Sequence, residues 1–267
     1  MNGPASIDTL PTLLDFAPNA VHQNVVRDLA NLHLGCLASF LTPKPHYPGQ
    51  YHSLGTGFYV VWPENPDIVR LVTAVHVLEG FDFKHGRITI GGRCIALGDV
   101  GHRNLDINRD VVVWSIPSRH FIHYGITIVA GFPLWLPDAA QATYIPTQSF
   151  VIMGYPASKN KALDFRDGKE PNRQITAMAI HASPRLSNEG ILHLAYSGKG
   201  ITESWVGMTT TSPHLKGMSG SPLLRIVFER DTDRLGMVLA GVFTERDKLK
   251  QQLSAGWFGD PWLVPSR

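Results

Sequence analysis

Three residues that together could perform nucleophilic chemistry occur in the order His76, Asp110 and Ser219. A serine hydroxyl is a weak nucleophile until an adjacent general base takes its proton, and that base needs a third group to orient it. His76 lies in "RLVTAVHVLEG", where a β-like run ends, and Asp110 immediately precedes the apolar run 111–116. Ser219 lies in "HLKGMSGSPLL", residues 214–224. The spacing predicts a nucleophile, a base and an orienting carboxylate at the ends of strands.

The loop around Ser219 has the glycine that an oxyanion-binding turn needs. Gly217 can adopt backbone conformations that are closed to other residues, and it lets a substrate carbonyl approach the main chain. The N–H groups of Gly217 and Ser219 can then converge on one developing oxyanion. Taken alone, the stretch fits an ordinary Gly/Ser turn at least as well, so the interpretation depends on what lies upstream.

The chain order of these residues separates the known serine arrangements. No histidine follows Ser219, which excludes an α/β-hydrolase, because that class places its histidine last. The order Asp, His, Ser of subtilisin-like enzymes remains formally open, although the region before His76 shows little strand–helix alternation. The order His, Asp, Ser is favoured. Asp106 is the rival of Asp110 in the same loop, and we favour Asp110 because a strand follows it directly.

The elements that must carry these residues are mainly strands. From residue 53 onward, short β-like runs alternate with clusters of turn residues, a pattern typical of a sandwich or barrel. The Pro-rich stretch 131–148 separates two β-rich halves of similar length. Within residues 19–41, apolar residues spaced by three and four predict one amphipathic helix that runs into a strand near Cys36.

Composition narrows the function classes further. The formal net charge is +2 and the basic residues are scattered, which argues against a nucleic-acid partner. No run approaches the ~20 apolar residues of a membrane helix, and no secretory signal is apparent at the N-terminus. Cys36 and Cys94 are the two cysteines; we expect both to be free, with no zinc site and a cytoplasmic location.

Four segments in this order, "GTGFYV", "TAVHVL", "RDVVVWSI" and "GMSGSP", resemble the signature segments of trypsin-like (chymotrypsin-fold) serine peptidases. The likeness is greater to bacterial members that lack disulfides, and "FVIMGYP" resembles the strand that often opens their second barrel. The resemblance covers roughly residues 53–245. It implies an all-β fold of two six-stranded antiparallel β-barrels, to which the helix pattern before residue 50, outside the resemblance, adds an N-terminal helical arm.

The implied domains are an arm with the amphipathic helix (1–50), a first barrel carrying His76 and Asp110 (51–140), and a second barrel carrying Ser219 plus a C-terminal tail (141–267). The resemblance implies a serine endopeptidase that cleaves polypeptide substrates through an acyl-enzyme intermediate, without metal or cofactor.

The resemblance also assigns the roles. His76 is implied as general base, Asp110 as its orienting partner and Ser219 as nucleophile. Gly217 and Ser219 are implied as oxyanion-hole donors, with the Met218 N–H nearby and the Met218 side chain as a wall of the cleft.

Residues near the nucleophile and on a following strand are implied as walls of the substrate pocket. The candidates are His214, Lys216, Gly241 and Val242. Residues 209–216 contain no acidic side chain, which argues against a pocket for lysine or arginine. A preference for acidic or small polar side chains and a preference for apolar ones both remain open.

Two further expectations concern regulation and function class. The sequence has no Ile-Val-Gly-Gly-type junction before "GTGFYV", so control by a newly cut N-terminus is not expected. Residues 1–50 are expected to pack on the barrels or dock a regulatory protein. The alternative function is a catalytically silent trypsin-like fold that serves as a binding module.

Overall fold

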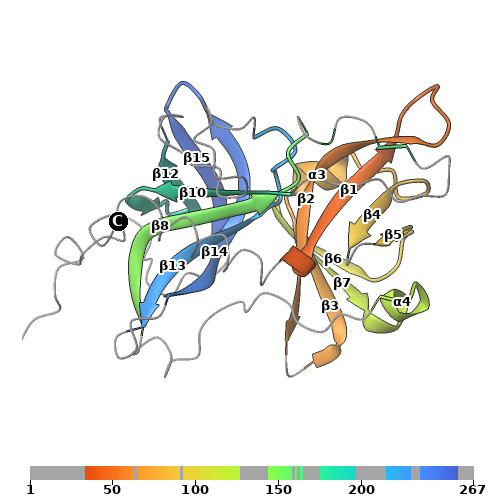
Figure 1. The fold of residues 1–267 in the computed structure, drawn as a ribbon, viewed down its shortest axis with the longest axis horizontal. Helices are drawn as coiled ribbons and strands as arrows, with labels where there is room; N and C mark the ends of the chain where they lie inside the picture. The colour runs from red at the N-terminus through yellow and green to blue at the C-terminus, as the bar shows by residue number, and fades with distance from the viewer. Residues whose placement is uncertain are drawn as a thin grey trace, which may run out of the picture.

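The computed structural model describes residues 34–62, 65–90, 93–126, 144–157, 160, 163–164, 175–196, 215–229 and 235–257. These residues form two antiparallel β-sheets that stand side by side, the first in red to yellow-green and the second mainly in green to blue (Figure 1). The all-β class of two antiparallel units, predicted from the sequence, is confirmed. The arrangement is consistent with a two-barrel, chymotrypsin-like fold.

The first sheet has eight strands. Seven of them form one path in the order β5 (Arg93–Ile95), β4 (Arg87–Ile90), β1 (Leu37–Pro43), β2 (Gln50–Trp62), β3 (Asn65–Thr73), β7 (Val111–Pro117) and β6 (His102–Asp106). The eighth, β9 (Leu163–Asp164), pairs with the start of β2. Helix α3 (Val75–Glu79) follows β3, and helix α4 (Ser118–His123) follows β7.

The second sheet has seven strands. Their order is β10 (Thr176–His181), β8 (Tyr144–Gly154), β13 (Pro222–Glu229), β14 (Leu235–Asp247), β15 (Gln252–Trp257), β12 (Ile191–Ala195) and β11 (Pro184–Leu186). The first strand of the second sheet along the chain is β8. The later strand β13 comes back to lie beside it, and β13 pairs with β8 on one side and with β14 on the other. This return brings the segment before β13, which contains Ser219, to the middle of the sheet.

The strands form because their apolar side chains point toward the faces of the sheet that are buried. In β7, Val112, Trp114 and Ile116 are buried and alternate with partly exposed residues. The large apolar cluster of the first sheet also includes Val151 of β8 and Leu224 of β13. The two sheets therefore pack on one another through side chains of β8 and β13, and this contact positions the site.

The number of strands and the start of the first sheet differ from expectation. The sheets contain eight and seven strands in the described residues, not six each. β1 lies inside the segment 1–50 that the sequence analysis assigned to the arm, and it pairs with both β2 and β4. The first five residues of β1 are all buried, and β1 begins at Leu37, where the sequence predicted that a helix would run into a strand. Most of the predicted helix at 19–41 lies outside the described residues, which begin at the short 3-10 helix η2 (Leu34–Cys36).

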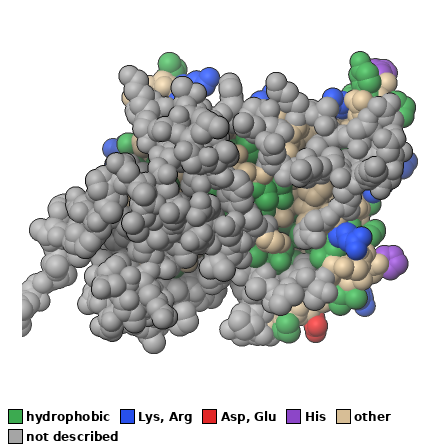
Figure 2. Space-filling view, viewed as in Figure 1, with side chains coloured by type: hydrophobic (Ala, Val, Ile, Leu, Met, Phe, Trp, Pro, Cys, Tyr) green, Lys and Arg blue, Asp and Glu red, His purple; other side chains and the backbone are tan. Residues whose placement is uncertain are grey.

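The surface view adds the distribution of charge. On the face drawn in Figure 2, the described basic and histidine side chains lie in separate positions over both sheets. In the described part of the chain, no helix has both the length and the apolar character that crossing a membrane requires.

Candidate active site

His76 is carried by α3, immediately after β3. The helix is anchored because Val75, Val77 and Leu78 are buried, whereas the His76 side chain is 45% exposed. The main-chain N–H of Val75 donates to the oxygen of Asp110 at 3.2 Å. The helix start is thereby fixed to the turn that carries Asp110, and His76 faces the surface beside that turn.

The carboxylate of Asp110 binds His76 twice. Asp110 Oδ1 accepts the main-chain N–H of His76 at 3.1 Å, and Asp110 Oδ2 lies 2.6 Å from His76 Nδ1. An ionised carboxylate only accepts hydrogen bonds, so Nδ1 carries the proton and Nε2 is left as the basic nitrogen of the neutral ring. The arrangement fixes both the tautomer and the orientation of the imidazole.

Three acidic groups act on the His76 ring. The hydrogen bond with Asp110 raises the pKa of His76 above the ordinary value of 6.5, and partial burial of the ring opposes this shift. The charges of Asp110, of Glu79 on the same helix and of Glu245 on β14 raise the pKa further. His76 therefore keeps its proton to a higher pH than a free histidine.

Asp106, the rival carboxylate, has a different partner. Its Oδ1 accepts the main-chain N–H of Arg109 at 3.1 Å, and its Oδ2 lies 3.3 Å from Arg109 Nε. Asp106 therefore braces the turn, whereas Asp110 contacts the histidine.

The nucleophile loop consists of tight turns that glycines make possible. Gly217 and Gly220 have φ angles of 87° and 85°, the left-handed region that favours glycine. The N–H of Gly220 donates to Phe243 O at 2.7 Å, and the N–H of Ser221 donates to Met218 O at 2.9 Å. The loop is thus bonded to β14 and folded back on itself around Ser219.

Thr56 of β2 joins this loop to the first sheet. Its N–H donates to Ser219 O at 2.8 Å, and its hydroxyl donates to Gly217 O at 3.0 Å while accepting the N–H of Tyr155 at 2.9 Å. Thr73, at the end of β3, donates to Thr56 O at 2.6 Å. Since β3 leads directly into α3, the same contacts hold the nucleophile loop beside the helix that carries His76.

The hydroxyl of Ser219 is oriented toward the second sheet. It donates to Thr244 O at 2.9 Å, and in the described part of the chain it makes no hydrogen bond with His76. The serine side chain has three staggered rotamers. Because a hydroxyl has one proton to donate, a hydrogen bond from Ser219 to the imidazole requires that the bond to Thr244 O be broken.

The main-chain N–H groups of Gly217 and Ser219, on either side of Met218, have no acceptor among the described residues. The Met218 N–H differs, because it donates to Leu215 O at 2.9 Å. The Met218 side chain is 1% exposed and packs in the apolar core of the second sheet. Met218 thus neither has a free N–H nor forms a cleft wall, contrary to the expectation from sequence.

The four candidates for the substrate pocket fall in different places. His214 lies outside the described residues, and Lys216 is exposed next to Gly217. Gly241 and Val242 are buried within β14 and pair with strands on both sides. Both edges of β14 are paired at these two residues, with β13 at Val242 and Gly241 on one side and with β15 on the other. Further along β14, the main-chain oxygen of Thr244 accepts the hydrogen bond from Ser219, and Glu245 is exposed.

The described residues also include side chains of the kinds that bind metal ions, and two cysteines. No group of three or more His, Cys, Asp or Glu side chains in this part of the chain could hold a metal ion. Cys36 and Cys94 form no disulfide. Burial raises the pKa of the Cys36 thiol to about 11, and a hydrogen bond with Tyr59 opposes this shift only in part.

Sequence reasoning missed Thr56 and Thr244 as residues of the site. Thr56 stands between Gly55 and Gly57 in a strand, and glycines inside a strand indicate a close approach of another backbone. A Cβ at Gly55 would lie 2.8 Å from Ser219 O, so the signal was present. Thr244 acts through its main-chain oxygen and leaves no such signal.

The comparisons with known proteins complete this description. No protein-family model and no curated protein sequence matches the chain. Among solved structures, the chain is similar to the active form of the Rv3671c protease from M. tuberculosis, at 14% identity and a TM-score of 0.47 over 90% of this chain and 83% of that one.

Two viral proteases are also similar. For the catalytically active tobacco etch virus protease the identity is 8% and the TM-score 0.44, over 87% of this chain and 76% of that one. For the NS6 protease of murine norovirus 1 the values are 12% and 0.36, over 80% and 91%. The chain is thus similar to proteases of chymotrypsin-like fold at low identity and low TM-score, and its activity has to be argued from its own residues.

Proposed function

We propose that the protein is a serine endopeptidase that uses His76 as general base, Asp110 as its orienting carboxylate and Ser219 as nucleophile. The observation that carries the proposal is the 2.6 Å contact between Asp110 Oδ2 and His76 Nδ1. Further support comes from the nucleophile loop, which Thr56 and Thr73 tie to the strand that precedes His76.

The proposed chemistry uses only groups of this chain, the substrate and water. Ser219 Oγ attacks the carbonyl carbon of a peptide bond while its proton passes to His76 Nε2. The N–H groups of Gly217 and Ser219 bind the oxygen that becomes negative. His76 then gives the proton to the leaving amine, so the peptide bond breaks and an acyl ester remains on Ser219. Water, deprotonated by His76, hydrolyses the ester and restores the serine.

The hydrogen bond from Ser219 to Thr244 O must break before the attack. The serine is only partly buried, and the change is a rotation of one side-chain bond. The same hydrogen bond is the one observation that favours the second candidate function, a catalytically silent fold that binds polypeptides. In that function Ser219 would brace the loop against β14.

A fluorophosphonate probe distinguishes the two functions, because it phosphonylates a serine only where a base activates it. The proposal expects labelling of the unmodified protein and loss of labelling in Ser219→Ala and His76→Ala. Ser221→Ala is the matched control, since Ser221 lies two residues away with its hydroxyl buried. The same four proteins are then assayed with fluorescently labelled casein.

The expected result is Ser219-dependent labelling together with cleavage of casein, both retained in Ser221→Ala. Labelling that persists in Ser219→Ala would reject Ser219 as the nucleophile, and absence of labelling in a folded unmodified protein would reject the peptidase and support the silent fold. Polypeptides are the proposed substrates. A regulatory partner of residues 1–50 finds no support, because residues 1–33 lie outside the described part of the chain.

A further inference from the structure

The main chain at Asp110 has a conformation that its surroundings must impose. Its φ angle is 55°, in the left-handed region that is disfavoured for residues with a side chain. The N–H of Asp110 donates to Ile107 O at 3.2 Å, which closes a turn of four residues directly before β7. Whatever stabilises this turn also determines where the Asp110 carboxylate points.

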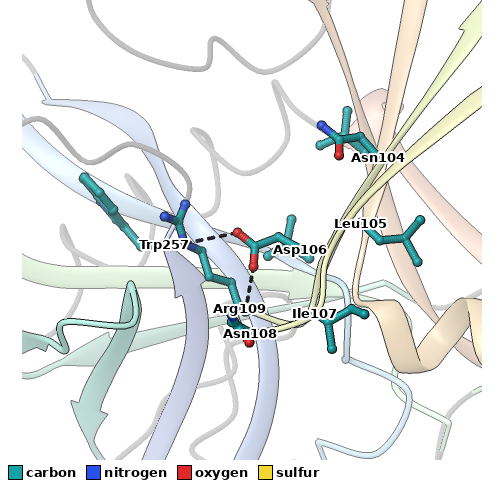
Figure 3. Close-up of a pocket in the computed structure, with 9 residues that line it drawn as sticks. Asn104, Leu105, Asp106, Ile107, Asn108, Arg109 and Trp257 are labelled. Carbon is teal, nitrogen blue, oxygen red and sulfur yellow. Dashed lines mark hydrogen bonds and ion pairs between the residues drawn. The ribbon is translucent and has the colours of Figure 1, made fainter.

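Asp106 and Arg109 hold the turn together. The two oxygens of the Asp106 carboxylate bind the main-chain N–H and the Nε of Arg109, at 3.1 and 3.3 Å. Figure 3 shows the Arg109 side chain extending toward Trp257 of β15, with the Asp106 carboxylate on its other side. These residues line one side of an open pocket of about 560 Å³ between the β6–β7 hairpin and the end of β15.

Arg109 lies directly on the second sheet, at two glycines. A Cβ at Gly190 would lie 2.5 Å from Arg109 Nε and 3.1 Å from its Cζ, and a Cβ at Gly256 would overlap Arg109 O. Gly190 also accepts the N–H of Trp257 at 2.8 Å, so the two glycines belong to one bonded surface. Both the main chain and the side chain of Arg109 therefore rest on the sheet that carries Ser219.

We propose that Arg109 is a positioning residue: held by Asp106 and seated on the second sheet at Gly190 and Gly256, it keeps Asp110 in the place from which it orients His76. The inference rests on the proposed function for its effect on catalysis. The turn couples the two sheets, because Asp110 and His76 belong to the first sheet and Ser219 to the second. A purely stabilising role is disfavoured, since an ion pair with both partners about 40% exposed adds little to stability.

The pKa of His76 reports this positioning with a definite sign. The charged groups near the ring are Asp110, Glu79 and Glu245. Removing the positive charge of Arg109 would, by Coulomb's law alone, raise the pKa of His76. Displacement of Asp110 would lower it, because the hydrogen bond with Asp110 is the largest cause of its elevation. A fall in the pKa therefore distinguishes lost positioning from a changed charge.

The test compares Arg109→Ala and Arg109→Lys with His85→Ala. His85 is the matched control, because Asp82 holds its main-chain N–H and its Nδ1 in the same i,i+3 arrangement, in the turn between α3 and β4. The kcat and KM for a peptide substrate, the melting temperature and the His76 pKa from NMR titration are measured. The His76 signal is assigned by its loss in His76→Gln.

For Arg109→Ala we expect a kcat lower by about 10- to 100-fold, as for small misplacements of catalytic groups, with KM within about twofold and a lower His76 pKa. In Arg109→Lys we expect part of the kcat and part of the His76 pKa elevation to be retained. If Arg109→Ala does not fold, Arg109→Lys provides the test. An unchanged or raised His76 pKa in a folded Arg109→Ala, or equal effects of His85→Ala, overturns the inference. The NMR titration of His76 does not require an active enzyme. If Ser219-dependent labelling fails and the proposed function is rejected, the titration still shows whether Arg109 positions Asp110.

Discussion

The hydroxyl of Ser219 donates a hydrogen bond to the main-chain oxygen of Thr244 at 2.9 Å. This bond exists because β13 ends its pairing with β14 at Val242, which leaves the next residues of β14 beside the nucleophile loop. It uses the serine's hydroxyl proton, while the neighbouring N–H groups of Gly217 and Ser219 have no acceptor among the described residues. In this form of the site, the two N–H groups proposed to bind the oxyanion are available, and the serine hydroxyl is hydrogen-bonded to β14 and not to His76.

The first prediction concerns a covalent adduct at this serine. After fluorophosphonate labelling, Ser219 Oγ carries phosphorus and can no longer donate to Thr244 O. We expect a phosphonyl oxygen within about 2.7–3.1 Å of both the Gly217 and the Ser219 nitrogen. A crystal structure of the adduct checks this, and a phosphonyl oxygen directed away from both nitrogens would contradict the assigned oxyanion hole.

The second prediction is the effect of Asp110→Asn on turnover. An asparagine can donate to His76 Nδ1 and so favours the wrong tautomer, in which Nε2 holds the proton. In serine peptidase triads this change lowers kcat by about 10⁴-fold. We expect a loss of that order in the casein assay with labelling slowed in parallel. Asp106→Asn is the comparison, because the asparagine oxygen can still accept the Arg109 N–H, and it should cost far less.

The third prediction is the pH dependence of stability. The pKa of His76 is raised above 6.5 in the folded protein, so proton binding favours the folded state. That contribution is complete below pH 6.5 and is lost as the pH rises through the folded pKa. Asp110→Asn removes its largest cause. The difference in melting temperature between the unmodified protein and Asp110→Asn should therefore be greater at about pH 5.5 than at about pH 9. An equal difference at both values would show that His76 has no raised pKa.

Much of this site could be predicted from sequence because its residues stand at strand ends. Strand β3 ends at Thr73 and places His76 on the next turn of chain, and β7 begins immediately after Asp110, as the apolar run 111–116 indicated. The choice of Asp110 over Asp106 also agrees with the hydrogen bonds. The roles of these residues in catalysis stay predictions.

What sequence could not supply are the contacts between the two sheets. Arg109 and Gly256 are 147 residues apart, and only the folded chain shows that they touch. Gly241 and Val242 were assigned to the pocket by their distance from Ser219 along the chain, and only the pairing register shows that both lie between β13 and β15. A strand was expected near Cys36, and β1 begins at Leu37, but its buried run shows no alternating pattern, so its place in the first sheet could not be predicted.

The fourth prediction tests the tight packing at Gly220. A Cβ there would overlap Thr56 O and Thr73 Oγ1, and the φ angle of 85° adds backbone strain. We expect Gly220→Ala to lower the free energy of unfolding by about 3–5 kcal/mol. Gly98→Ala is the control, because Gly98 has a φ angle of 61° with no atom within 4 Å of the added methyl. Its cost should be about 1–2 kcal/mol. Chemical denaturation measures both, and equal losses would mean that the overlap at Gly220 is relieved.

The fifth prediction isolates the hydroxyl of Thr56, which is fully buried between the sheets. Thr56→Val keeps the shape of the side chain but leaves Gly217 O and the Tyr155 N–H without this partner. The loss of these two buried hydrogen bonds should lower the free energy of unfolding by about 2–4 kcal/mol. Thr56→Ser keeps the hydroxyl and loses one buried methyl, at a cost of about 1 kcal/mol. Because Gly217 supplies a proposed oxyanion donor, fluorophosphonate labelling should slow in Thr56→Val and stay near normal in Thr56→Ser. Equal labelling rates in two folded variants would show that Thr56 stabilises the contact between the sheets without shaping the nucleophile loop.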